Sequence, residues 1–210
     1  MLLHGEHDIQ ILKPLVGDST LYTSEHRFLD AQDKGKLSVF VAEKLFKHAG
    51  EVHIRIIDHL VIKGLGGFGY KGTMQSVLGT SEKPNRKPDH TSEEQTNPGQ
   101  AFIYRLNGDV NPLHVDPKIA KQAGFDRPIL HGLCFFGFST RAVYEQYCGN
   151  DPSRVTRVAV RFTSPVFPGE TLIVDMWKES PSKIYFETRT KERGHIALKG
   201  IMEIAPAAKL

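Results

Sequence analysis

The sequence has few cysteines, no long apolar run and no large excess of charge of either sign. Its two cysteines, Cys134 and Cys148, fall in what we expect to be one helix, where a rise of about 1.5 Å per residue separates them by roughly 21 Å. A disulfide needs Cα atoms within about 7 Å of each other. We therefore expect both thiols to be packing residues, in a protein of a reducing compartment.

The lack of long apolar runs argues against a membrane-spanning helix, which needs about 20 predominantly apolar residues. The N-terminal stretch MLLHGEHD contains charged side chains almost at once, so we expect no signal peptide. The net charge of +3 is small, and the sequence has neither a dense basic stripe nor an aromatic platform. These features argue against a nucleic-acid-binding surface, although a mildly basic protein suits a small polyanionic ligand.

The last three residues, Ala208-Lys209-Leu210, are a close variant of the Ser-Lys-Leu signal for peroxisomal import. They follow Pro206 and lie beyond the last predicted strand, so we expect them to be accessible to a receptor. The sequence therefore predicts a peroxisomal location, with the import receptor as a partner.

Most of the chain has the alternating or β-branched pattern of strands, and clusters of Gly, Pro and Asp separate these strands. Two segments predict helices: Pro117–Ala123, which starts with proline, and His131–Tyr147, whose apolar surface is wide enough for burial. The expected fold class is α+β. The predicted strands are His7–Leu12, Thr20–Leu29, Lys36–Phe46, Val52–Ile62, Ala101–Leu106, Thr156–Phe162, Thr171–Lys178, Lys183–Thr190 and Ile196–Ile204.

Two further segments have the composition of loops. Ser76–Gln100 contains three prolines among polar residues, so we expect a linker. Gly64–Gly69, GLGGFG, follows a strand as a dinucleotide-binding loop does, but Tyr70-Lys71-Gly72 is a poor start for the helix that such a loop requires. We expect this run to form a tight or flexible turn instead.

A weak internal repeat relates the two halves of the chain. Pro14–Leu21, PLVGDSTL, aligns with Pro165–Leu172, PVFPGETL, and three strand-like runs follow each copy. The pattern predicts a double hot-dog fold with two antiparallel sheets, the second wrapped around the long central helix. Only the second copy is preceded by its own strand and helix. We therefore expect the first hot dog to be N-terminally truncated.

This interpretation divides the chain into four parts. Residues 1–75 should form the partial N-terminal hot dog, and residues 76–100 the linker. Residues 101–206 should form the C-terminal hot dog, and residues 207–210 the tail that carries the import signal.

The loop GDVNPLH concentrates groups that can move protons. Adding water to an activated double bond needs one group that takes a proton from water and a source of a proton for the neighbouring carbon. Asp109 and His114 suit this task, because an imidazole with a pKa near 6.5 can act in either direction at neutral pH. Gly108 and Pro112 bend the loop and would bring both side chains to one side. Asn111 would bind the water or brace the loop.

The start of the longer helix, His131-Gly132, offers a place for negative charge that develops on a substrate oxygen. Free backbone N–H groups and the positive end of the helix dipole point outward there. Gly132 has no side chain to block approach. One such donor typically contributes about 3 kcal/mol in the transition state.

Two other interpretations of these residues are open. An Asp-x-Asn sequence is also common in turns and helix caps. A metal site can also be imagined, with the ligands Asp109, His114, Asp116 and His131. However, the spacing of Cys and His residues is not that of a zinc site.

Together the motifs resemble a known family. Gly108–His114, GDVNPLH, and Ala123–Leu133, AGFDRPILHGL, are similar to the signature of the hydratase 2 enzymes, which are MaoC-like, (R)-specific enoyl-CoA hydratases. The resemblance covers essentially the whole chain and is strongest to the hydratase domains of peroxisomal multifunctional enzymes. It implies reversible hydration of trans-2-enoyl-CoA to (3R)-3-hydroxyacyl-CoA in peroxisomal fatty-acid β-oxidation, without a metal or other cofactor.

The resemblance also implies residue roles. Asp109 and His114 would be the catalytic pair, Asn111 would support them, and Gly132 would donate to the thioester oxygen. The first hot dog would build the acyl-chain pocket, and the second would carry the catalysis. The residues implied to contact the acyl-CoA substrate are His4, Gly5, Lys34, Val110, Pro112, Leu113 and Phe162.

Two alternatives keep the same fold but change the function. One is a truncated, non-catalytic acyl-CoA-binding hot-dog protein, and the other is a hot-dog thioesterase. By analogy with hot-dog proteins we expect a homo-oligomer in each case.

Overall fold

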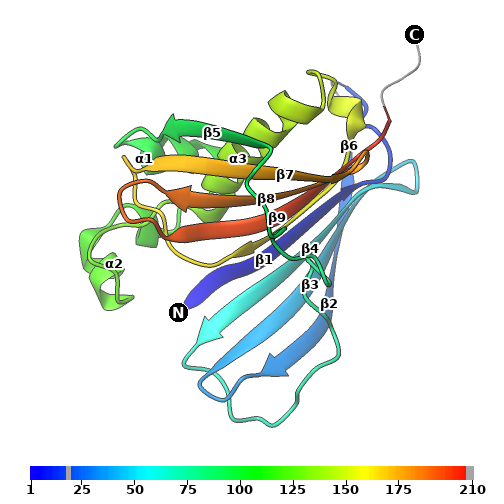
Figure 1. Cartoon of the computed structure of the whole chain (residues 1–210). Coiled ribbons are helices and arrows are strands. Elements are labelled where there is room, and N and C mark those ends of the chain that lie inside the picture. The colour runs from blue at the N-terminus through cyan, green and yellow to red at the C-terminus, as the bar shows by residue number, and fades with distance from the viewer. Residues whose placement is uncertain (18–19, 207–210) are drawn as a thin grey trace.

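The computed structural model describes residues 1–17 and 20–206, and this part of the chain forms one antiparallel sheet of nine strands (Figure 1). The strand order across the sheet is β2-β3-β4-β1-β6-β9-β8-β7-β5. The strands are β1 (Leu2–Ile11), β2 (Thr23–Asp33), β3 (Leu37–His48), β4 (Glu51–Lys63), β5 (His90–Gln95), β6 (Val155–Phe162), β7 (Thr171–Ser180), β8 (Lys183–Thr190) and β9 (Ile196–Ile204).

Three α-helices and three short 3-10 helices accompany the sheet in the described residues. Both predicted helices are confirmed, as α2 and α3. The helices are α1 (Gln100–Tyr104), η1 (Arg105–Asn107), η2 (Pro112–His114), α2 (Pro117–Gln122), α3 (Gly132–Tyr147) and η3 (Pro152–Arg154).

Strand β1 joins the two halves of the sheet, because it pairs with β4 on one side and with β6 on the other. The prediction of two separate antiparallel sheets is therefore wrong, and the strands of both halves form one continuous sheet. Figure 1 shows β2, β3 and β4 extending away from the half that carries α3. The α+β class is confirmed, as is the packing of the second half around one long helix.

The main core lies between α3 and the strands β6 to β9, all of which the helix contacts. The buried face of α3 carries Cys134, Phe135, Ser139 and Val143. The Ser139 hydroxyl lies 2.7 Å from the Thr188 hydroxyl on β8, so this buried hydroxyl is hydrogen-bonded. This packing holds the first turn of α3 rigidly at the end of the sheet, where the functional residues gather.

The two cysteines lie in this core at either end of α3. Cys134 and Cys148 are both buried and, within the described residues, not in a disulfide. Burial away from water raises the pKa of the Cys134 thiol to about 11. The expectation that they are packing residues is confirmed.

The segment Ser76–Gln100, expected to be a linker, instead belongs to the sheet and its cover. Val77 and Leu78 pack with Trp177 against the sheet face opposite α3. Further along, β5 pairs with β7 at the edge of the sheet. The sequence of β5, HTSEEQ, is polar because an edge strand faces solvent, and charged side chains there prevent pairing with other chains.

Residues Ala101–Leu106, predicted as a strand, form α1 and η1. Ala101 is the only buried residue of α1, whereas Phe102 and Leu106 are 63% and 86% exposed. A short apolar run is compatible with a buried strand or with a helix, and its periodicity does not distinguish the two. The strand prediction is wrong because β5 already occupies this edge of the sheet.

The glycine-rich run Gly64–Gly69 forms a turn that closes on the carboxylate of Asp33. This carboxylate accepts hydrogen bonds from the backbone N–H groups of Gly35, Gly67 and Gly69. Gly67 and Gly69 have φ angles of +83° and +80°, a left-handed conformation that favours glycine. The run is a tight turn, as expected, and the described residues Tyr70–Ser76 directly after it are not helical.

None of the helices in residues 1–17 and 20–206 is both long and apolar enough to cross a membrane. The C-terminal Ala208-Lys209-Leu210 lies outside the described residues.

Candidate active site

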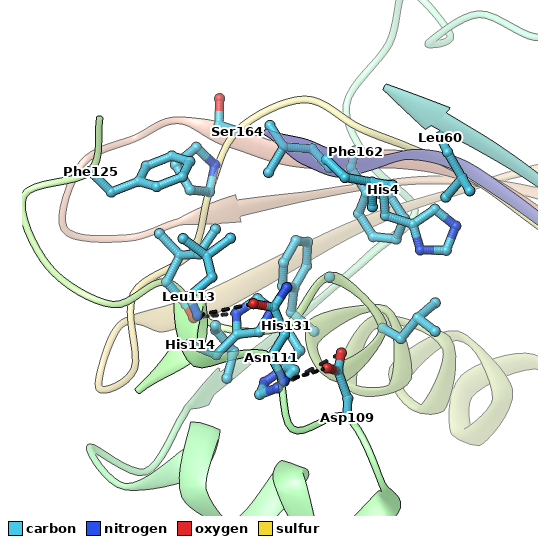
Figure 2. Close-up of a pocket in the computed structure, with 18 of the residues that line it drawn as sticks. His4, Leu60, Asp109, Asn111, Leu113, His114, Phe125, His131, Phe162 and Ser164 are labelled. Atoms are coloured by element: carbon cyan, nitrogen blue, oxygen red, sulfur yellow. Dashed lines mark hydrogen bonds and ion pairs between the residues drawn. The ribbon is translucent and has the colours of Figure 1, made fainter. Parts of the chain in front are cut away.

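A cavity of about 440 Å³ opens where the loop after η1, the first turn of α3, β1 and the segment after β6 meet (Figure 2). Its polar lining includes Asp109, Asn111, His114 and His131, and His4 contributes from β1. Its apolar wall includes Leu2, Leu60, Leu113, Phe125, Phe135 and Phe162. The cavity therefore combines a small polar centre with an apolar surface, which is typical of sites for small molecules.

His114 lies at the end of η2 and is held by a backbone carbonyl. Its Nδ1 lies 2.8 Å from the carbonyl oxygen of Ile129, and a carbonyl can only accept. Nδ1 therefore carries the proton in the neutral ring, and Nε2 has a free lone pair. Burial lowers the pKa of His114, because the charged form loses hydration. At neutral pH this imidazole is a neutral base.

The loop before His114 is shaped by its own hydrogen bonds. The Asn111 side-chain oxygen accepts from the Leu113 N–H at 3.1 Å and caps η2. The Asp109 carboxylate accepts from the Asn111 N–H, also at 3.1 Å. Gly108 has a φ of +102°, which a side chain would strain. Asn111 thus braces the loop, one of the two uses expected of its amide.

His131 is the principal addition that the structure makes to this site. Its ring is stacked on that of His114, with centroids 3.7 Å apart and planes 26° apart. Both ring nitrogens are buried and have no hydrogen-bond partner among the described residues. Burial, followed by the neighbouring His114, lowers the pKa of His131 to about 4. His131 is therefore a neutral ring at neutral pH.

Asp109 lies beside this stacked pair. Its Oδ2 is 3.9 Å from Nε2 of His131, and its side chain is half exposed to the cavity. One ligand atom each of Asp109, His114 and His131 lies within 4.8 Å of the others. The nearly parallel rings do not converge on a single point, so the geometry suits stacking better than metal binding. Asp116, the other imagined metal ligand, instead caps α2 by accepting from the Lys118 N–H at 2.8 Å.

Gly132 begins α3 at the wall of the cavity. Within the described chain, α3 has no side-chain N-cap, and its first N–H group has no protein acceptor. A Cβ at Gly132 would lie 3.4 Å from the Phe162 ring. The unpaired N–H and the helix dipole together favour a negatively charged or strongly polarised oxygen at this position.

The other residues of the sequence prediction divide into two groups. Three of them line the cavity with the polar centre: His4, Leu113 and Phe162. The other four lie outside the cavity lining: Gly5, Lys34, Val110 and Pro112. Gly5 lies within an irregularity of β1, Lys34 lies in the turn between β2 and β3, and Val110 is 66% exposed. The sequence predicts His131 only as the start of the helix and as a conceivable metal ligand, not as a ring in contact with His114. The motif ILHGL places it next to Gly132, but the stacking depends on the fold.

Comparison with known proteins supplies the family. The family described as "MaoC like domain" matches residues 80–200. The "Probable enoyl-CoA hydratase 2" of Dictyostelium discoideum is 39% identical over 218 residues, which covers 100% of this chain and 72% of that protein. "Peroxisomal multifunctional enzyme type 2" of Mus musculus is 41% identical over 208 residues, covering 98% of this chain but only 28% of that larger protein.

The fold is similar to solved structures as well. A "MaoC-like dehydratase" from Phytophthora capsici superposes with a TM-score of 0.91 at 39% sequence identity, covering 99% of this chain and 73% of that one. The continuous sheet and the position of α3 therefore correspond to those of a solved MaoC-like protein.

Proposed function

The chain belongs to the MaoC-like domain family, and on this premise we propose that it is a hydro-lyase that reversibly hydrates trans-2-enoyl-CoA to (3R)-3-hydroxyacyl-CoA. The observation that carries the proposal is the meeting of three groups in one cavity: the Asp109 carboxylate, the free Nε2 of His114 and the unpaired N–H of Gly132. The names of the relatives, enoyl-CoA hydratase 2 and peroxisomal multifunctional enzyme, point to the same reaction.

Asp109 and His114 act on one water molecule. Nε2 of His114 takes a proton as the water oxygen bonds to the third carbon of the enoyl group. The Asp109 carboxylate accepts a hydrogen bond from the second O–H of the same water, which remains on the product hydroxyl, and offsets the charge of the imidazolium that forms. The imidazolium then returns its proton to the second carbon, so that the double bond is replaced by one C–O and one C–H bond on the same face.

Gly132 stabilises the intermediate charge. Addition of water moves negative charge onto the thioester oxygen, and a preorganised N–H at a helix start is a suitable donor for it. His131 keeps the His114 ring in its plane through stacking, and its depressed pKa keeps a second positive charge out of the site.

The two parts of the chain divide the work. Residues 101–206 carry the reacting groups, and residues 1–75 supply the wall of the acyl pocket through Leu2, His4 and Leu60, which line the same cavity. Gly5, Val110 and Pro112 act on substrate binding by shaping the backbone around the cavity. The Lys34 ammonium contacts the phosphates of CoA, because a cation there complements their charge.

The pathway and location follow the same premise. Relatives of this chain are named peroxisomal, and Ala208-Lys209-Leu210 resembles an import signal. The reaction belongs to peroxisomal fatty-acid β-oxidation, the import receptor is a partner, and the chain acts as a homo-oligomer. A fluorescent fusion that ends in these residues should co-localise with peroxisomes, and one without them should not. The mass of the purified chain in solution, measured by light scattering, tests the oligomer.

The activity is tested on the purified chain with crotonyl-CoA and decenoyl-CoA. Loss of enoyl absorbance should be rapid for the wild type and should fall by roughly a hundredfold or more in Asp109→Asn and His114→Gln, the range typical of removing a general acid–base. Asp126→Asn, an exposed aspartate outside this cavity, is the matched control and should behave as the wild type.

Three outcomes contradict the proposal. Wild-type rates in either active-site variant remove the assigned roles, and a (3S) product removes the stereochemical assignment. Release of free CoA, detected with a thiol reagent, would identify a thioesterase instead.

A further inference from the structure

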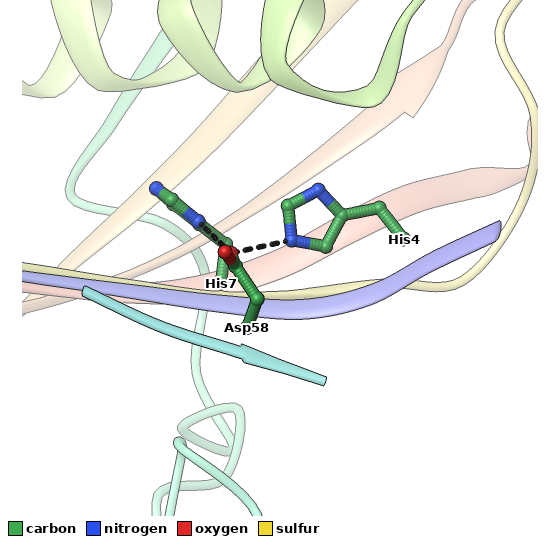
Figure 3. Close-up of side chains that lie close together, drawn as sticks. All are labelled: His4, His7 and Asp58. Carbon is green, nitrogen blue, oxygen red and sulfur yellow. Dashed lines mark hydrogen bonds and ion pairs between the residues drawn. The ribbon is translucent and has the colours of Figure 1, made fainter. Parts of the chain in front are cut away.

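A second polar cluster lies on the β1–β4 pair beside the cavity (Figure 3). His4 and His7 on β1 both point at one oxygen of Asp58 on β4. The His4 Nε2 lies 2.9 Å from Asp58 Oδ1, and the His7 Nδ1 lies 2.7 Å from the same atom. The two rings are almost perpendicular, at 87°. His7 and Asp58 take no part in the hydration mechanism.

A local irregularity of β1 is what brings these side chains together. Residues three apart on a regular strand point to opposite faces of the sheet, so His4 and His7 should diverge. The register of β1 against β4 shifts between His4 and Glu6, as in a β-bulge. Such a shift re-aims side chains and is common next to functional sites. The backbone is therefore built so that both imidazoles reach one face.

Gly5 makes this irregularity sterically possible. A Cβ at Gly5 would lie 2.8 Å from Val61 Cγ2 and 3.0 Å from the backbone oxygen of His59. Both distances are too short for ordinary contact, and the second atom belongs to the backbone of the neighbouring strand. The stretch His4-Gly5-Glu6-His7 thus specifies a convergent pair of imidazoles through its glycine.

We propose that His4, His7 and Asp58 form a binding site for a divalent transition-metal ion, and that Zn²⁺ is its occupant. Two imidazoles and one carboxylate are a typical ligand set for zinc when a fourth position stays open. One ligand atom of each residue lies within 4.8 Å of the others. With the ion bound, each neutral ring carries its proton on the nitrogen that faces away from the metal.

The distances need little adjustment to accept the ion. Tetrahedral zinc bonds of about 2.0–2.2 Å place ligand atoms roughly 3.3 Å apart. The nitrogens now lie 2.9 and 2.7 Å from the carboxylate oxygen, so these two separations would widen by about 0.4 and 0.6 Å when an ion binds. Lys44 Nζ holds the other oxygen, Asp58 Oδ2, at 2.9 Å. This outer contact orients Oδ1 toward the rings, as second-shell groups do in metal sites.

The site opens on the cavity side. The side chains of His7 and Asp58 are 7% and 5% exposed, whereas that of His4 is 20% exposed and lines the cavity. An ion can therefore enter from the cavity, and its fourth position faces that space. Among the described residues a second candidate group comprises Asp109, His114 and His131, but its two stacked rings do not converge as those of His4 and His7 do.

Occupancy has a consequence that rests on the proposed function. A bound ion holds His4 away from the acyl-CoA and places a hydrated cation beside the apolar wall. Zn²⁺ should therefore inhibit hydration by competing with the substrate, and it should do so through His7 and Asp58.

The test uses the whole purified chain and the metals alone. Equilibrium dialysis should give one Zn²⁺ per chain, and Co²⁺ should give the visible absorption bands of a four-coordinate ion. Because loss of a ligand should weaken binding at least as much as loss of an outer-shell partner, the Kd should rise by about tenfold or more in His7→Gln and Asp58→Asn. The Gln amide can still donate to Asp58, which keeps the His7→Gln variant folded, as thermal unfolding will check.

Two controls separate this site from other histidines. His26→Gln changes an exposed histidine on β2 and should bind Zn²⁺ as the wild type does. His131→Gln alters the other candidate group and should also leave binding unchanged. The proposal is overturned if the wild type binds no stoichiometric Zn²⁺, if His7→Gln binds it normally, or if His131→Gln loses it.

Inhibition of enoyl-CoA hydration adds a second measurement. Zn²⁺ should raise the apparent KM of the wild type and should have little effect on His7→Gln. Zn²⁺ binding without hydratase activity contradicts only the proposed function, whereas hydratase activity without Zn²⁺ binding contradicts only the metal site.

Discussion

The imidazole of His131 lies against that of His114, with ring centroids 3.7 Å apart, and neither nitrogen of His131 has a hydrogen-bond partner among the described residues. Burial of a polar ring without partners is unfavourable, so such a ring is expected where the stacking itself matters. His131 fixes the plane of His114, while the Ile129 carbonyl fixes its tautomer. Together these contacts aim Nε2 into the cavity.

The pH dependence of hydration should reflect the burial of His114. Only the neutral ring can accept a proton from water, and burial lowers its pKa from the ordinary 6.5. Activity should therefore be retained below pH 6.5 and be lost as the pH falls through the lowered pKa. The measurement is kcat/KM for crotonyl-CoA against pH. An acid limb centred at or above pH 6.5 would contradict the assigned role.

His131 should make the fold sensitive to acid. Its pKa is about 4 in the folded chain and near 6.5 when unfolded, so the unfolded chain binds more protons between these values. The free energy of unfolding should therefore fall as the pH falls through this window, by about 3 kcal/mol in total for this ring. His131→Phe keeps an aromatic ring and removes the titration. The free energy of unfolding in urea should be measured at both ends of this pH window. Its change between the two pH values should be smaller in this variant than in the wild type, and an equal change would contradict the prediction.

Gly132→Ala should separate stability from activity. Alanine stabilises a helix by up to about 1 kcal/mol relative to glycine, but its methyl group would lie 3.4 Å from the Phe162 ring, beside the proposed oxyanion position. We expect a Tm equal to or above that of the wild type and a kcat lowered by roughly tenfold or more. Gly137→Ala in the same helix is the matched control, because a Cβ there meets nothing within 4 Å. It should raise the Tm and leave kcat unchanged.

Gly5→Ala should destabilise the chain. The added Cβ would overlap with the Val61 side chain and with the backbone oxygen of His59, and overpacking of this kind typically costs about 1–3 kcal/mol. The free energy of unfolding, measured in urea, should fall by that amount. Adding Val61→Ala removes the side-chain overlap but not the backbone one, so it should restore only part of the loss. Full wild-type stability in Gly5→Ala would contradict the steric role of this glycine.

Several features of the fold can be predicted from sequence because they depend on local pattern. Proline at the start of α2 and the apolar surface of α3 mark both helices, and alternation marks eight of the nine strands. The ninth, β5, has a polar sequence because it lies at the sheet edge. Conversely, the apolar run Ala101–Leu106 resembles a strand and forms α1 and η1. Both errors arise because the position of a segment relative to the sheet, rather than its local sequence preference, decides whether it forms a strand.

The functional residues likewise fall into those that local sequence predicts and those that depend on the fold. The local sequence is enough to predict the loop of Asp109, Asn111 and His114 and the glycine at the start of α3, since these groups lie within one short stretch with its own turn residues. The stacking of His131 on His114 and the contact of His7 with Asp58 on the neighbouring strand both require the folded chain. The first contact depends on how the core holds α3 against the loop. The second depends on a register shift in β1, which reverses the face to which a side chain points and leaves no trace in the alternation of the strand.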